Sequence, residues 1–135
     1  MLKSPKLVKS RLMFKEFYFD IDQLDHPETM YIPYLNPLIE SKLKMKGAIK
    51  YLRGIEWKIV DDFKYSHKEI EAKTLFLWGQ NDEITFPVSK AEKMVEQFDA
   101  TCYFIKVPSS KVMPHEENPE FVVEKMGAFF KNELP

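Results

Sequence analysis

The sequence has little of several residue types, and each shortage excludes a class of protein. It holds a single cysteine, Cys102, so no disulfide can form within the chain, as is typical of the reducing cytoplasm. It holds 4 glycines and no Gly-rich phosphate or dinucleotide turn, so we expect no nucleotide cofactor. No secretory leader opens the chain, and no apolar run approaches the roughly 18 to 20 residues of a transmembrane helix. We therefore expect a cytoplasmic protein without a membrane partner.

An excess of charge of one sign is also missing. The chain has 20 basic and 21 acidic residues and a pI near 6.3, so we expect no nucleic-acid partner. The 3 histidines have no spacing typical of a zinc site, so we expect no metal. What the chain does have is 44% hydrophobic and 14% aromatic residues, which suits a dense core or a pocket for an apolar ligand.

Residues 1–66 carry helical patterns and no strand pattern. Residues 6–19 have apolar side chains at spacings that predict a helix, apolar over much of its circumference. Residues 38–53 predict a second helix, which Gly54 ends. The first half of the chain should therefore consist of helices and loops.

Residues 67–135 predict strands as well as helices. The expected order is strand, helix, strand, helix, at residues 73–79, 88–98, 102–107 and from 118 onward. Ser89 and Glu92 predict a capping box at the start of the first of these helices. The fold class is therefore α/β, with two parallel strands joined by a right-handed crossover. The first strand should keep one edge that this sequence does not fill.

Chemistry is expected just after the first strand. Asp82 follows Gly79 by three residues, beyond the carboxyl end of the strand, where open α/β sheets place their catalytic groups. A carboxylate there can orient a histidine and stabilise its imidazolium. The alternative is that Asp82 only caps the loop, because Asp favours turns in its own right. From these residues alone, the two interpretations weigh about equally.

Three blocks of sequence carry a family resemblance, at residues 74–82 (TLFLWGQND), 91–94 (AEKM) and 113–120 (MPHEENPE). In this order they resemble the end of the α/β-hydrolase family, in its epoxide hydrolase and haloalkane dehalogenase branch. Residues 48–53, AIKYLR, are similar to a helix that leads out of the family's cap. The resemblance implies a partial α/β-hydrolase fold, with a helical cap-like segment at 1–66 and the last two strand-helix units at 67–135.

The same resemblance assigns roles to residues. Asp82 is implied to be the acid of a catalytic triad that hydrolyses an ester, an epoxide or a carbon–halogen bond through a covalent intermediate, without a metal or organic cofactor. The aromatic helices before it are implied to form a lid over a small apolar substrate. Phe17, Tyr51 and Trp57 are our candidates for the substrate pocket, and packing in the core is the favoured alternative for Trp57.

Two of the three triad members are missing from the sequence. There is no Gly-x-Ser-x-Gly elbow or Asp-containing relative of it, so the nucleophile is absent. The family's base lies in a Gly-His pair, and the matching positions here read Lys111-Val112, so valine replaces the base. His115 is the alternative base. We expect it instead to be exposed or to cap the next helix, because a base must reach both the nucleophile and the acid.

We therefore expect an inactive carboxyl-terminal part of an α/β-hydrolase. The alternative is a non-catalytic binding or self-assembly module that uses an open strand edge and the aromatic surface of the cap. The expected partners are a small apolar ligand and either a second copy of the chain, in a homo-oligomer, or a separately encoded amino-terminal half.

Overall fold

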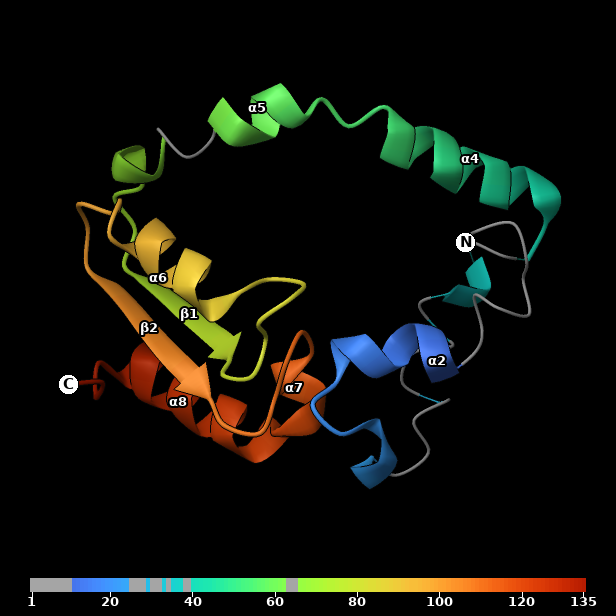
Figure 1. Ribbon diagram of the computed structural model, residues 1–135. Helices are drawn as coiled ribbons and strands as arrows, with labels where there is room; N and C mark the ends of the chain where they lie inside the picture. Colours follow the sequence, from blue (N-terminus) through green and yellow to red (C-terminus); the bar gives the residue numbers. More distant parts are fainter. Residues whose placement is uncertain (1–10, 25–28, 30–32, 34, 38–39, 63–65) are drawn as a thin grey trace.

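The computed structural model of the chain describes residues 11–24, 29, 33, 35–37, 40–62 and 66–135. In chain order its elements are α2 (Arg11–Phe14), η1 (Lys15–Phe17), η2 (Ile21–Gln23), α4 (Lys42–Arg53), α5 (Trp57–Asp62), η4 (His67–Glu69), β1 (Thr74–Gly79), α6 (Val88–Val95), β2 (Cys102–Val107), α7 (Pro114–Glu117) and α8 (Pro119–Lys131) (Figure 1). The described residues thus combine helices with one sheet of two strands, and the predicted mixed α/β character is confirmed.

The strands β1 and β2 run parallel, as predicted. Their register extends from Thr74 opposite Cys102 to Gly79 opposite Val107. The connecting helix α6 lies on one face of the sheet and α8 lies on the other (Figure 1). Cover on both faces explains why the strands are apolar runs without alternation. The second predicted strand is confirmed at both ends, and the first begins one residue later than predicted.

The helix α6 starts and ends differently from the prediction. Its N-cap residue is Pro87, which has no side-chain cap, so the predicted capping box of Ser89 and Glu92 is wrong. The carboxylate of Glu92 instead pairs with the ammonium of Lys106 on β2, at 2.7 Å. The helix ends at Val95, three residues early, because the N–H groups of Gln97 and Phe98 donate to carbonyls three residues back, a tightening common at helix ends.

The first predicted helix is shorter than expected. Its residues 6–10 lie outside the described part of the chain, and the helical backbone ends at Phe17, with Tyr18 extended at φ −114° and ψ 148°. Tyr18 is buried, and its hydroxyl donates to Oε2 of Glu116 in α7, 2.5 Å away. A tertiary contact therefore ends the helix where periodicity alone predicted that it would continue.

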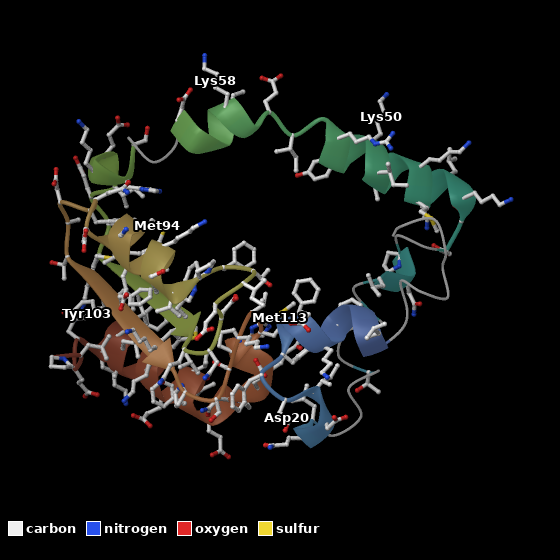
Figure 2. The ribbon with its side chains drawn as sticks, viewed as in Figure 1. Asp20, Lys50, Lys58, Met94, Tyr103 and Met113 are labelled. Atoms are coloured by element: carbon white, nitrogen blue, oxygen red, sulfur yellow. The ribbon has the colours of Figure 1, made fainter. Side chains whose placement is uncertain are left out.

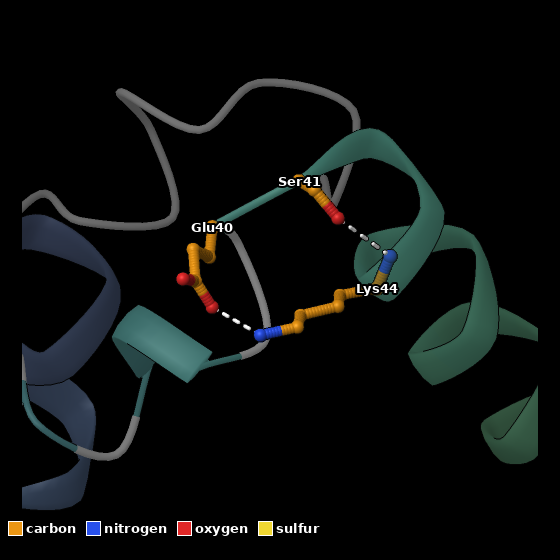
Figure 3. A network of polar contacts seen from close by, with 3 residues as sticks. All are labelled: Glu40, Ser41 and Lys44. Carbon is orange, nitrogen blue, oxygen red and sulfur yellow. Dashed lines mark hydrogen bonds and ion pairs between the residues drawn. The ribbon is translucent and has the colours of Figure 1, made fainter.

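The helix α4 is capped at both ends by local contacts. The hydroxyl of Ser41 accepts the N–H of Lys44 at 3.2 Å, and the ammonium of Lys44 pairs with the carboxylate of Glu40 (Figure 3). Gly54 is the C-cap, as predicted. The ends of α4 are thus set by residues next to them in the sequence.

The helices α4 and α5 form an arc that stands apart from the sheet (Figure 1). Lys50 and Lys58 lie on the outer side of this arc and are exposed (Figure 2). None of the helices within the described ranges combines the length and the apolar character that crossing a lipid bilayer requires.

Candidate functional site

The loop after β1 is built around the carboxylate of Asp82. This side chain is buried, with 2% of its residue surface exposed. Its Oδ1 accepts the N–H groups of Ile84 (3.3 Å) and Thr85 (2.9 Å), and its Oδ2 accepts that of Phe86 (3.0 Å). Three backbone donors therefore hold one carboxylate at the carboxyl end of the strand. These hydrogen bonds are the contacts that the loop-capping interpretation of Asp82 predicts.

A second loop, after β2, crosses the end of β1 at very short range. A Cβ atom placed on Gly79 would lie 1.8 Å from the carbonyl oxygen of Lys111, so only glycine allows this approach. The two loops are also joined by a hydrogen bond, in which the N–H of Asn81 donates to the carbonyl of Ser110 at 2.9 Å. The crossing brings Val112, which follows Lys111, to the same end of the sheet as Asp82.

A cavity of about 170 Å³ lies where the two loops meet. Its lining comes from the end of β1, the Asp82 loop and the second loop, and consists of Leu77, Trp78, Gly79, Asp82, Phe86, Lys111, Val112 and Pro114. The indole Nε1 of Trp78 donates to the carbonyl of Phe86 at 2.8 Å, and the two rings meet edge to face with centroids 6.4 Å apart. This contact folds the Asp82 loop back over β1 and forms one wall of the cavity.

The chemistry of this cavity is limited by its lining. It is smaller than the roughly 300 to 1,000 Å³ of most drug-sized ligand sites, so it suits a molecule of a few heavy atoms. Its ionisable side chains are those of Asp82 and Lys111, and no histidine is among the described residues that line it. Val112 offers only methyl groups, which accept no proton. The arrangement can hold a small apolar molecule beside a fixed carboxylate.

The other candidates for chemistry lie elsewhere. His115 is on the exposed side of α7, with 57% of its side chain exposed, and its Nε2 lies 3.8 Å from Oε1 of Glu116. It is not among the residues that line the Asp82 cavity. Cys102 starts β2 at the opposite end of the strand, and burial raises the pKa of its thiol, which disfavours the reactive thiolate.

Of the three predicted pocket aromatics, Phe17 and Tyr51 are not among the described residues that line the Asp82 cavity. The ring of Phe17 lies 5.7 Å from that of Phe14 and packs against a buried cluster centred on Tyr18 and Ile21. Tyr51 is 74% exposed on α4. The backbone of Trp57 begins α5, and its side chain lies outside the described part of the structure. Phe17 contacts the second loop through its carbonyl, which accepts the N–H of Val112 at 3.0 Å.

Glutamates of α7 accept hydrogen bonds from the segment that follows Phe17 and hold it against this helix. The carboxylate of Glu117 accepts the backbone N–H groups of Phe19 and Lys111, so it joins this segment to the second loop. Burial raises the pKa of Glu117, although these two hydrogen bonds oppose the rise. Met113 adds apolar contact with the cluster around Tyr18 (Figure 2). Residues from the first half of the chain thus support the loop that carries Val112.

Sequence reasoning found two residues of the cavity and missed others. The sequence singled out Asp82 and Val112 but gave no place in the site to Trp78, Phe86 or Lys111. Trp78 and Phe86 flank Asp82 in the sequence, so an aromatic residue on each side of an acidic turn was the sequence pattern that could have indicated these two cavity residues. Nothing in the local sequence marked Lys111, because its place depends on the crossing of two loops.

Comparisons with known proteins were negative. No family model, no curated protein and no solved structure matches this chain. A proposal about function therefore depends on the residues and their geometry.

Proposed function

We propose that the chain is the carboxyl-terminal part of an α/β-hydrolase whose catalytic centre has kept its acid, Asp82, and lost its base and nucleophile. In complete relatives the reaction would be hydrolysis of an ester, an epoxide or a carbon–halogen bond. In this chain the cavity beside Asp82 binds a small apolar molecule without turning it over.

One observation carries this proposal: Asp82 and Val112 line the same cavity at the carboxyl end of β1. In a triad the acid must lie beside the base, because it holds the imidazole in its productive orientation and stabilises its charged form. The sequence blocks that resemble the hydrolase family assign these two positions to the acid and the base. Their meeting in space, 30 residues apart in the chain, is what the resemblance requires.

The residues present can position a ligand but cannot move a proton through a triad. The carboxylate of Asp82 is fixed by three backbone donors, so it presents negative charge without freedom to rotate. Trp78 and Phe86 supply an apolar wall. Because Val112 accepts no proton, a bound water or hydroxyl has no base in the position where the hydrolase family places it.

A second candidate function, self-assembly, is favoured by the open edge of β1. Within the described residues the sheet has two strands, so each strand pairs along one edge only. The sequence of β1, TLFLWG, contains no charge and no proline, which are the devices that usually keep an exposed edge from pairing. The strand β2, by contrast, carries Lys106.

Restoring a histidine at position 112 tests the proposal directly. In the Val112→His variant, the pKa of the introduced imidazole should be higher, by about one pH unit or more, than in the variant that also carries Asp82→Asn. The physical reason is that a carboxylate within a few ångströms favours the charged imidazolium. The pKa values are measured from histidine ring proton shifts in NMR titrations between pH 5 and 8.5.

The ring proton shifts of His115, which is exposed and not among the residues that line the Asp82 cavity, serve as the internal control in both variants. If the introduced imidazole titrates identically with Asp82 and with the asparagine replacement, in variants shown by circular dichroism to be folded, position 112 is not a base position.

A further inference from the structure

The helix α8 has an apolar stripe that is exposed to solvent and lies beside the face that packs on the sheet. Val123, Met126 and Phe130 are 68%, 42% and 74% exposed. Their spacing of three and four residues places them on one side of a helix. On the adjoining side, which faces the sheet, Val122 is buried and the ring of Phe129 meets that of Tyr103 on β2, with centroids 6.2 Å apart. The stripe is therefore additional to the face that anchors α8.

A glycine lies within this stripe. Gly127 is next to Met126, and a Cβ placed on it would meet nothing within 4 Å. Glycine in a helix interior costs about 0.5 to 1 kcal/mol relative to alanine. Here the missing side chain leaves a hollow beside three exposed apolar groups.

We propose that this face pairs two copies of the chain through antiparallel α8 helices. A two-fold axis between Met126 and Gly127 sets Val123 opposite Phe130 of the second copy, and Met126 opposite the hollow at its Gly127. The surface is complementary to itself, as a two-fold interface requires. Neither Asp82 nor Val112 takes part in it.

The charges beside the stripe favour the same arrangement. Glu120, Glu124 and Lys131 lie along one flank of the stripe, because they are four and seven residues apart. In an antiparallel pair this flank faces itself, and Lys131 of one copy falls at the level between Glu120 and Glu124 of the other. Glu124 also has an ion pair with Lys125 of its own chain, at 2.7 Å, which leaves Glu120 as the freer partner. An antiparallel pair also opposes the two helix dipoles.

The interface should be weak. Three apolar side chains per copy bury much less than the roughly 800 Å² per partner of a standard stable interface. Dimers should therefore form in a concentration-dependent manner. The apolar stripe and the charges beside it are both complementary to the same surface on a second copy of the chain. An unrelated partner would need both kinds of complementarity independently.

Sedimentation velocity of the full chain across a wide concentration range tests this inference. The parent chain should pass from monomer to dimer as concentration rises. Phe130→Asp should weaken dimerisation at least tenfold, because it puts a charge into the stripe opposite Val123 of the second copy. Leu43→Asp is the matched control, since Leu43 is 79% exposed on α4, outside the stripe, and its replacement should leave the equilibrium unchanged.

Charge reversal tests the antiparallel register. Lys131→Glu should weaken the dimer by repulsion from Glu120 and Glu124, and adding Glu120→Lys with Glu124→Lys in the same chain should restore it. A monomer at every concentration overturns the inference. So does a dimer that Phe130→Asp leaves intact, which would point to the edge of β1 instead. Failure of the triple variant to restore pairing overturns the register, and circular dichroism checks that each variant is folded.

Discussion

Replacing Gly79 by alanine should lower the free energy of unfolding by about 3 kcal/mol. The added Cβ would lie 1.8 Å from the carbonyl oxygen of Lys111 and 2.5 Å from its carbonyl carbon. Both are backbone atoms, so no side-chain rotation relieves the clash. The loop after β2 has to move away from the end of β1, and Val112 moves with it. Urea unfolding followed by tryptophan fluorescence measures the loss.

The matched control is Gly127→Ala in α8. Its added Cβ meets no atom within 4 Å, so the substitution should stabilise the helix by about 0.5 to 1 kcal/mol. Both variants are measured at low protein concentration, where pairing of α8 does not contribute. If Gly79→Ala proves as stable as the parent, the close crossing of the two loops is wrong, and with it the meeting of Asp82 and Val112.

Replacing Asp82 by alanine should cost about 3 kcal/mol of stability. The carboxylate is buried and accepts three backbone N–H groups, and alanine would leave those donors without their acceptor. Asp82→Asn should cost roughly half as much, because the amide oxygen still accepts some of these bonds while its NH₂ group faces a donor. The difference between the two variants is measured by the same urea unfolding.

Asp99→Ala provides the comparison for this residue type. Asp99 is exposed, so its replacement should change stability by less than about 0.5 kcal/mol. A loss of similar size for Asp99→Ala and Asp82→Ala would mean that the loop around Asp82 is not organised by its carboxylate.

The role of Asp82 in the loop and its proposed ancestry as a catalytic acid are compatible. A carboxylate that must orient a histidine works best when its own position is fixed, and the N–H groups of Ile84, Thr85 and Phe86 fix it. The sequence left these two interpretations in balance. The structure supplies the contacts that the capping interpretation needs.

The sequence predicted the α/β core better than the first half of the chain. The strand at Cys102–Val107 was located at both ends because its apolar run stops at Pro108, a strong local signal. The end of the first helix depended on Tyr18 meeting Glu116, 98 residues away, which no local pattern encodes. Periodicity reports which faces are apolar, and distant contacts decide where those faces stop.

The candidate site likewise contains residues that the local sequence indicates and residues whose place depends on distant contacts. Asp82 could be found because the end of a buried strand, a glycine and an acidic turn are consecutive in the sequence. Lys111 could not, since it reaches the cavity through the crossing of the second loop over Gly79. A cavity formed by two loops is a property of their meeting, which neither loop predicts alone.

Turnover is the most direct test of the central claim, that this chain holds a triad acid without a base or nucleophile. Purified protein is incubated with aryl esters, epoxides and haloalkanes, and product is counted per chain. The expected result is less than one product per chain, with no difference between the parent and Asp82→Asn. Many products per chain, lost in Asp82→Asn and kept in Asp99→Asn, would contradict it.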